Sequence, residues 1–392
     1  MKNLKWHRFV FKVLRSPVRA FLRRKLNMEW VMAEPQKRPF ILLANHNTDF
    51  DPLLVAAGFH EHMYFVASDH ILRWKFAGKL VKFFFAPIAR VKATTEARTV
   101  MDVIKTVRSG VNVCIFAEGI RSFNGETNEI LPSTGKLIKQ SGAALITYKL
   151  EGGYFTTPLW GSGVRKGRMR GYIEHVYEPE KLKEMSADEI NEAIRKDLYL
   201  NEYELQKKDP VQYVGKNPAQ HLEYALYACP ACRGIGRLKS RGELFECECG
   251  LKVKYSFYGF FEGADGTTPP FETVLDWDRW QTNFMKQQFS EYRLLSASIP
   301  LFSDDGQSLY RFDRCGNTLH MTDGSLSMYN DRLEVRSVDG VTVFPLKDIS
   351  AMTIHGGNVL IFSTVDGGHY EIRNEKPRSA RKYVLSYKLL RS

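Results

Sequence analysis

The sequence predicts an α/β protein in which helices cover a sheet, followed by a small cysteine-rich unit and a β-rich C-terminal part. Apolar strand-like runs alternate with helix-like segments from about residue 38 to 180, which is typical of a sheet flanked by helices. Four of the six cysteines cluster between residues 229 and 249. From about residue 300, β-rich runs are separated by short turn signals.

Composition is that of an ordinary globular protein. With 392 residues and 44% hydrophobic content, the chain can bury a sizeable core and is expected to hold two or three domains. Since no apolar run reaches about 18 residues, we expect no membrane-spanning helix. Charges interrupt the apolar residues throughout the first 30 positions, unlike in a signal peptide. One cysteine cluster beside two isolated residues, Cys114 and Cys315, suits a reducing compartment.

Most of the net charge lies in residues 1–30, which hold nine Lys or Arg and one Glu. Their net charge of +8 leaves only +4 of the total +12 for the other residues, which disfavours nucleic acid as a partner. The apolar residues among these charges are Trp6, Phe9, Val10, Val13, Leu14, Phe21 and Leu22. Such a segment can lie in the interface of an anionic membrane. We favour this over a basic helix that packs on its own domain. Pro17 would kink any single helix in this segment.

The first predicted strand ends at a polar loop. Residues 40–44 form an unbroken apolar run after Pro39 and predict a buried strand. Asp51 followed by Pro52 predicts the start of a helix, with Asp51 as its N-cap. His46 is therefore expected on a short loop at the carboxyl end of a strand, where ligands bind in α/β sheets.

The remaining elements of this domain continue the alternation. We predict, in order, a helix over 96–110, a strand over 111–116, a helix over 134–142, a strand over 143–150 and a strand over 168–179. A final helix is predicted over 186–206, with a capping box between Ser186 and Glu189. The domain is expected to close near Asp209.

His46 and Asp51 together suggest acid–base chemistry. Each alone would be ordinary, as a loop histidine or a helix cap, but the loop lets the carboxylate reach one imidazole nitrogen. A carboxylate at Nδ1 fixes the tautomer and leaves Nε2 to take a proton from a substrate hydroxyl. Because no serine or cysteine nucleophile with a motif around it lies nearby, His46 would activate the acceptor directly.

A second polar loop, FAEGIRS at residues 116–122, also follows a buried strand and is expected at the same sheet edge. Arg121 offers a planar fork suited to a phosphate, and Glu118 could orient it or an acceptor hydroxyl. Gly119 would let the backbone approach a ligand closely. Taken in isolation, the heptapeptide is better explained as a surface loop with an internal Glu118–Arg121 pair.

In this order and about 70 residues apart, the two loops resemble the first and third signature blocks of the glycerolipid acyltransferases typified by 1-acylglycerol-3-phosphate O-acyltransferase. The first block, Asn-His-x4-Asp, is matched by Asn45, His46 and Asp51. The third block of the family is Phe-Pro-Glu-Gly-Thr-Arg-Ser. This sequence matches it at Phe116, Glu118, Gly119, Arg121 and Ser122, and has Ala117 in place of the Pro and Ile120 in place of the Thr. The stretch PIARVK, with Arg90, resembles the second block, and the similarity covers roughly residues 30–200.

The resemblance implies transfer of a fatty acyl group from acyl-CoA or acyl carrier protein to the hydroxyl of a lysophosphatidate or related lysophospholipid, in phospholipid synthesis or remodelling. It implies His46 as the base and Asp51 as its orienter, without a metal in this step. It also implies that the acceptor is held by Arg90, Glu118, Gly119, Arg121 and Ser122. A peripheral, monotopic protein at the cytoplasmic face of a membrane would fit the basic N-terminal segment.

A second class of function stays open at this point. A non-catalytic protein could keep the acyltransferase fold and bind lipids or partners through its C-terminal modules. The presence of His46, Asp51, Glu118 and Arg121 disfavours a loss of catalysis.

The clustered cysteines resemble a zinc ribbon. A C-P-x-C pair is followed after fourteen residues by C-x-C-G, which gives the ligand set Cys229, Cys232, Cys247 and Cys249. We favour zinc over unmetallated thiols because the glycine-rich loops have little core of their own. Four sulfur ligands fill a tetrahedral site, so this zinc would be structural. Zinc ribbons bind nucleic acids or proteins, and the motif does not distinguish the two.

The last part of the chain is predicted to consist of antiparallel hairpins closed by a helix. A helix over 276–289 precedes it, and the turn signals are Asn330-Asp331, Asp339-Gly340, Gly356-Gly357 and Asp366-Gly367-Gly368. With a last helix over 379–390, this layout resembles a pleckstrin-homology-like or GRAM-like module. We therefore expect a membrane-interface segment (1–30), an acyltransferase domain (31–210), a zinc-ribbon-like module (225–262) and a β-rich C-terminal domain (270–392).

Overall fold

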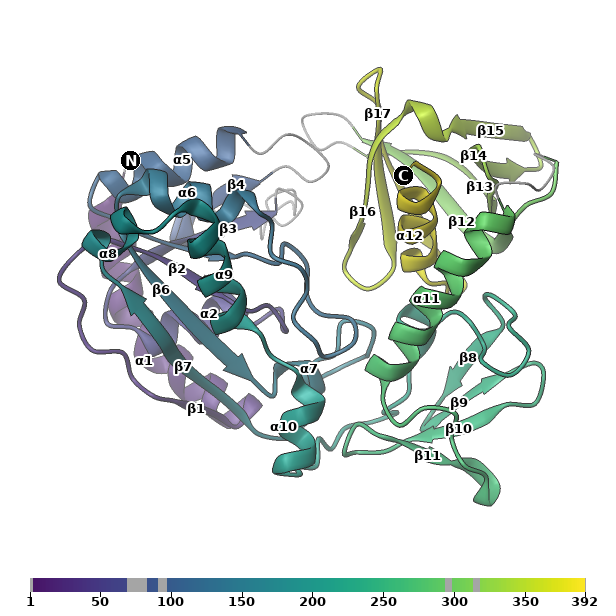
Figure 1. Cartoon of the computed structure of the whole chain (residues 1–392), viewed down its shortest axis with the longest axis horizontal. Helices are drawn as coiled ribbons and strands as arrows, with labels where there is room; N and C mark the ends of the chain where they lie inside the picture. Colours follow the sequence, from purple (N-terminus) through teal and green to yellow (C-terminus); the bar gives the residue numbers. More distant parts are fainter. Residues whose placement is uncertain (1–2, 69–82, 91–96, 293–297, 313–317, 392) are drawn as a thin grey trace. The chain divides into compact units, whose positions relative to one another are not determined.

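The computed structural model describes residues 3–68, 83–90, 97–292, 298–312 and 318–391. The chain divides into two compact units (Figure 1). Unit 1 comprises residues 1–159 and 163–215, and unit 2 comprises residues 160–162 and 216–392.

Unit 1 is built on a seven-stranded mixed sheet with the order β1-β7-β6-β2-β5-β3-β4. Neighbouring strands are parallel except β6 and β7, which are antiparallel. The strands are β1 (Met28–Trp30), β2 (Phe40–Ala44), β3 (Met63–Ser68), β4 (Ile88–Arg90), β5 (Asn112–Phe116), β6 (Ala144–Glu151) and β7 (Met169–Tyr177). The α/β class predicted from the alternating pattern is thereby confirmed for this unit.

Helices cover both faces of this sheet, as Figure 1 shows. Alternate residues of β2 point to opposite layers, since Phe40 and Leu42 pack with α1 and α2, whereas Ile41 and Leu43 pack with α5, α6, α8 and α9. This double burial explains why the strand is apolar without interruption. The helices are α1 (Leu4–Leu26), α2 (Asp51–Gly58), α5 (Ala97–Arg108), α6 (Ser133–Ser141), α7 (Gly153–Thr156), α8 (Pro179–Glu184), α9 (Ala187–Leu198) and α10 (Glu202–Lys208).

Two helix predictions are wrong in detail. The helix predicted over 186–206 is two helices, α9 and α10, because the chain leaves the helix before Asn201, whose side chain caps α10 by accepting from the backbone N–H of Tyr203. The capping box at the start of α9 is present as predicted. Asp51 is the first residue of α2 and not its N-cap, since that position is Phe50 and has no side-chain cap.

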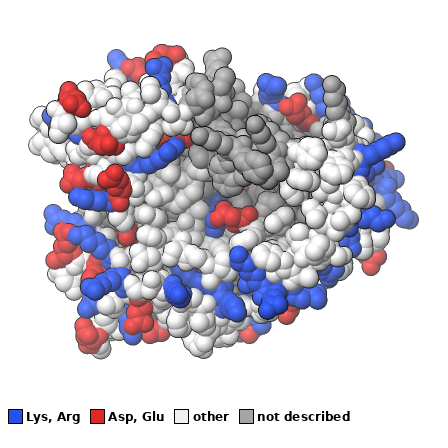
Figure 2. Space-filling view, turned by 180° about the vertical axis from the view of Figure 1, so that it is seen from behind, with Lys and Arg blue, Asp and Glu red and all other residues white. Residues whose placement is uncertain are grey.

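Helix α1 packs on its own unit, which was the alternative to a membrane-interface segment, and the membrane role of this segment stays a prediction. It runs as one helix through Pro17, and Leu22 and Leu26 are fully buried in the core of unit 1. On its other side it exposes the apolar residues Trp6, Phe9, Val13, Leu14 and Phe21. In the view from behind, Lys and Arg predominate over the region where α1 lies (Figure 2). Within the described residues, no helix is both long and apolar enough to cross a membrane.

The described residues of unit 2 form two antiparallel sheets and two long helices. The small sheet has the order β11-β10-β9-β8, with β8 (Leu238–Arg241), β9 (Leu244–Cys247), β10 (Lys252–Tyr255) and β11 (Phe261–Gly263). The larger sheet has the order β15-β14-β13-β12-β18-β17-β16. Its strands are β12 (Phe302–Phe312), β13 (Thr318–Met328), β14 (Arg332–Ser337), β15 (Gly340–Pro345), β16 (Ile349–His355), β17 (Val359–Thr364) and β18 (His369–Asn374). The four predicted turns all join consecutive antiparallel strands.

The last helix, α12 (Ala380–Arg391), ties unit 2 together. Arg381 forms a forked ion pair with Asp278 of α11 (Val274–Tyr292), with N–O distances of 2.6 and 2.9 Å. The Ser379 hydroxyl donates to the carbonyl of Tyr224 at 2.8 Å. The pleckstrin-homology-like interpretation of this part stays a prediction.

Candidate active site

The two predicted polar loops meet at one edge of the unit 1 sheet. Strands β2 and β5 are parallel neighbours, and Ala44 pairs with Phe116, so the loops that follow them leave the sheet together. The Phe116 ring stacks on the His46 imidazole with centroids 4.5 Å apart. In addition, the backbone N–H of Ser122 donates to the His46 carbonyl at 3.1 Å. The loop of residues 116–122 thus holds the histidine in place.

His46 Nδ1 lies 2.8 Å from the Asp51 Oδ2 atom. The Asp51 side chain is fully buried, whereas the His46 side chain is 22% exposed and accessible to a substrate. The predicted contact between the two residues is therefore present. Because Nδ1 is bound by the carboxylate, Nε2 is the nitrogen that can exchange a proton with a ligand.

The Asp51 carboxylate organises the whole loop that precedes it. Oδ2 also accepts from the backbone N–H groups of Asn47 at 2.7 Å and Thr48 at 2.9 Å. Oδ1 accepts from the Thr48 hydroxyl at 2.6 Å. These hydrogen bonds fix the direction of the carboxylate toward His46.

Glu118 faces the protein interior. Its Oε1 accepts from the backbone N–H of His46 at 2.7 Å, and its Oε2 accepts from the backbone and side chain of Asn128 at 2.6 and 3.0 Å. Burial raises the pKa of Glu118 to about 8, although these hydrogen bonds oppose the shift. The side chain therefore fixes the position of His46 from behind.

Arg121 is also largely enclosed, with a side chain that is 8% exposed. Its Nε donates to the Asn47 carbonyl at 2.9 Å, and its Nη2 donates to the Thr157 carbonyl. Nη1 forms an ion pair with Asp49 at 2.8 Å, and the Asp49 side chain is 84% exposed. Nη1 is thus the atom of this guanidinium that meets a solvent-facing anion.

The other predicted binding residues have different surroundings. Gly119 adopts a left-handed conformation with φ 70°, which is unfavourable for a residue with a Cβ. The Ser122 hydroxyl is buried, where it donates to the Glu126 carbonyl at 2.7 Å and accepts from the Gly125 N–H at 3.0 Å. Arg90 ends β4, but its side chain lies outside the described part of the structure.

Sequence reasoning missed Glu202, which supports the histidine loop from α10. Its carboxylate accepts from the Asn47 side chain at 3.2 Å and from the backbone N–H of Gly152 at 2.8 Å. Burial raises the pKa of Glu202 to about 8. The only sequence signal was the Asn201-Glu202 step, which is typical of a new helix start and was absorbed into one long predicted helix.

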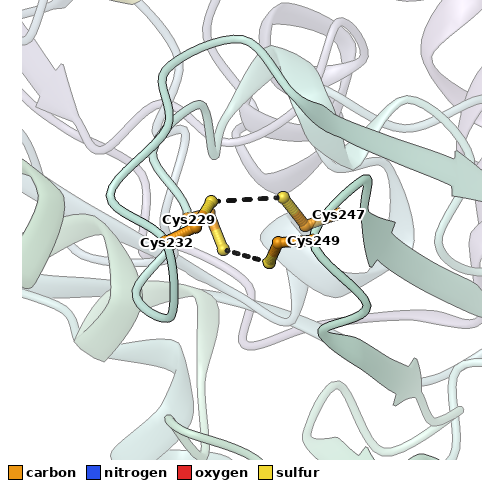
Figure 3. A group of neighbouring side chains, drawn as sticks. All are labelled: Cys229, Cys232, Cys247 and Cys249. Carbon is orange, nitrogen blue, oxygen red and sulfur yellow. Dashed lines mark hydrogen bonds between the residues drawn. The ribbon is translucent and has the colours of Figure 1, made fainter.

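Four thiols of unit 2 form a separate candidate metal centre. The Sγ atoms of Cys229, Cys232, Cys247 and Cys249 all lie within 4.8 Å of one another (Figure 3). The Cys229–Cys249 and Cys232–Cys247 sulfur distances are 3.7 and 3.8 Å. Tetrahedral zinc with ligands at about 2.3 Å requires sulfur atoms about 3.8 Å apart. The cluster therefore fits one four-coordinate ion.

A part-exposed histidine paired with a buried carboxylate at the edge of an α/β sheet defines a candidate acid–base site. Residues 25–151 of the chain match the family described as Acyltransferase. This segment contains His46, Asp51, Glu118 and Arg121. The chain thus carries an acyltransferase-family domain, and the resemblance drawn from its two polar loops is confirmed.

Several solved structures are similar to parts of the chain, and three of them follow. The 1-acyl-sn-glycerophosphate (LPA) acyltransferase PlsC from Thermotoga maritima is 18% identical, covers 51% of this chain and 81% of its own, and has a TM-score of 0.42. Inner Membrane Complex Sub-compartment Protein 3 from Toxoplasma gondii is 14% identical. The match covers 27% of this chain and 88% of that protein, with a TM-score of 0.18. The C-terminal domain of an unknown protein from Leishmania infantum is 9% identical. The match covers 28% of this chain and 97% of that domain, with a TM-score of 0.18. No curated protein matches the sequence.

Proposed function

We propose that this protein transfers a fatty acyl group from acyl-CoA or acyl carrier protein to the hydroxyl of a lysophosphatidate or related lysophospholipid. The observation that carries the proposal is the 2.8 Å contact between His46 Nδ1 and Asp51, inside the segment that matches the acyltransferase family. This contact directs the basic Nε2 atom to the ligand side.

In the proposed step, the acceptor hydroxyl gives its proton to His46 Nε2 while its oxygen attacks the thioester carbonyl carbon. Asp51 stabilises the imidazolium ion that forms. Collapse of the tetrahedral adduct breaks the C–S bond, and the leaving thiolate takes the proton from Nε2. The products are the acylated lipid and the free thiol of the donor.

The neighbouring residues are proposed to act in two ways. Glu118, Gly119 and Ser122 shape the loop that positions His46. Arg121 is proposed to meet the acceptor phosphate through Nη1, which at present pairs with Asp49. Arg90 remains a proposed acceptor ligand from the resemblance alone.

The proposed site of action is the surface of an anionic membrane, at its cytoplasmic face. Beside the exposed apolar face of α1, Trp6 packs against Phe83 and Phe84, with ring centroids 5.6 and 6.3 Å away. Phe83 and Phe85 are themselves exposed. Aromatic residues among Lys and Arg favour the membrane interface.

In unit 2, we propose that the four cysteines hold a structural zinc ion and that the β-rich part is a pleckstrin-homology-like interaction module.

The proposal is tested by supplying purified protein with both donor types and a panel of lysophospholipids. His46→Ala should lower acyl transfer about 10²- to 10⁴-fold, the usual contribution of a positioned base, without unfolding unit 1. His60→Ala, which removes an exposed imidazole of the same unit, serves as the control. Near-normal turnover by His46→Ala would reject this mechanism. Lipid binding without any turnover by the wild type would favour the non-catalytic alternative.

A further inference from the structure

Unit 1 has a hollow of about 500 Å³ at the C-terminal end of α1. It is lined by Phe21, Arg24, Lys25, Val164 and Lys166. Two of these residues are apolar, three are cationic, and none is acidic. Arg24 and Lys25 lie in the last turn of α1, where cations interact favourably with the helix dipole. Lys166 belongs to a different segment, so the dipole of α1 does not explain why a third cation lines the hollow.

The α1 side of the hollow lies close to the loop that follows β2. Lys25 Nζ lies 5.4 Å from the centre of the Phe21 ring and 5.4 Å from that of Phe50. Phe50 directly precedes Asp51, the partner of His46. The α1 wall of the hollow thus lies near the loop that carries His46. Val164 and Lys166 form its second wall.

That second wall is connected to the site through Arg121. The backbone N–H of Arg165 donates to the Thr156 carbonyl at 2.9 Å, and the next carbonyl, of Thr157, accepts from Arg121. In addition, Lys166 exchanges two backbone hydrogen bonds of 2.8 Å with Val214. Its side chain can therefore be replaced without loss of these bonds.

We propose that this hollow binds the phosphate headgroup of a bilayer lipid, next to the acyl-transfer site and separate from it. Three cations without a carboxylate complement a phosphate, whereas Phe21 and Val164 complement the apolar part of the same molecule. Phe21 also belongs to the exposed apolar face of α1, so a lipid in contact with this helix reaches the hollow directly. This inference goes beyond the proposed function, because it requires no acyl transfer.

The test measures binding of monomeric dihexanoyl phosphatidate to the full chain by calorimetry, without an acyl donor. Arg24→Gln and Lys166→Gln should each raise the Kd about fivefold, which corresponds to about 1 kcal/mol for one cation near a phosphate. Arg23→Gln is the matched control, because Arg23 is an exposed neighbour of Arg24 on the same helix turn and does not line the hollow. The control should leave the Kd unchanged.

Two further ligands identify the chemistry that is recognised. Phe21→Ser should weaken binding of the short-chain phosphatidate but not of inorganic phosphate, and neutral dihexanoylglycerol should bind far more weakly than the phosphatidate. Equal effects of Arg23→Gln and Arg24→Gln would overturn the proposal in favour of general electrostatic attraction. Inorganic phosphate that binds as tightly as the lipid would also overturn it. Because no turnover is measured, these outcomes are independent of the role of His46.

Discussion

Asp49 and Arg121 form an ion pair in which a carboxylate that faces solvent meets a guanidinium that is almost enclosed. The pair joins the loop after β2 to the loop after β5. The remaining donors of Arg121 are engaged by backbone carbonyls. A phosphate could therefore reach Arg121 by replacing the Asp49 carboxylate at Nη1, without disturbing those inner contacts.

Replacement of Asp49 by Asn tests this exchange. The substitution keeps the size of the side chain and removes the anion that competes for Nη1. We expect the KM for lysophosphatidate to fall by up to about fivefold at unchanged kcat, since an ion pair with one exposed partner contributes up to about 1 kcal/mol. The KM for a neutral monoacylglycerol should stay the same. An equal change for both acceptors would show that Arg121 does not meet the phosphate.

Glu202 should make the stability of unit 1 depend on pH. Its folded-state pKa is raised from 4.5 to about 8, so between these values the native state binds more protons than the unfolded state. The free energy of unfolding should therefore fall as pH rises from about 4.5 to 8, by up to a few kcal/mol.

The control for this pH effect is Glu202→Gln, which has no titrating carboxyl at this position. Denaturant unfolding of wild type and variant should be compared at several pH values. The stability advantage of the wild type should shrink as pH rises. A constant difference across this range would contradict the raised pKa.

Metal removal should act on unit 2. Elemental analysis is expected to find one zinc ion per chain, and Cys232→Ser should release it and lower the melting temperature of unit 2, because structural metal binding contributes directly to folding. Cys114→Ser, which makes the same atom exchange in β5 of unit 1, should leave the zinc content unchanged. Protein purified without chelator but lacking stoichiometric zinc would refute the assignment.

The exposed face of α1 should contribute to membrane binding through apolar contacts. The Phe9 and Val13 side chains are 58% and 53% exposed, and their transfer into a bilayer interface contributes about 1.5–3 kcal/mol each at full burial. The double variant Phe9→Ser/Val13→Ser should weaken binding to anionic vesicles at least tenfold, as measured by co-sedimentation.

Val365→Ser, at a still more exposed apolar position of unit 2, is the control for vesicle binding. Point variants are preferable to deletion of residues 1–30. Leu22 and Leu26 of α1 are fully buried, so the deletion would open the core of unit 1. Unchanged vesicle binding by the double variant would contradict a membrane role for this face.

The sequence was most informative where local patterns decide the structure. The apolar runs of β2 and β5, the capping box of α9 and the hairpin turns of unit 2 could all be predicted, because each depends on neighbouring residues. The approach of His46 to Asp51 could also be predicted, since only the four residues of one short loop separate them.

Contacts between distant residues could not be predicted in this way. Glu202 reaches Asn47 across 155 positions, and Arg121 reaches Thr157 across 36. Nothing in the local sequence distinguishes a buried carboxylate that holds a loop from an exposed one in a helix. The break before α10 was missed for a related reason, because the helical pattern continues through Tyr199–Asn201 while tertiary contacts end the helix.

The ion pair between Arg381 and Asp278 has a consequence for the synthesis of the protein. A ribosome delivers Asp278 about one hundred codons before Arg381, so this ion pair can form only late in synthesis. The contacts between α11 and α12 can therefore form only after α12 has emerged, whereas unit 1 has all of its residues much earlier. Nonsense and frameshift alleles that remove residues 379–391 are accordingly expected to yield a chain that cellular proteases degrade.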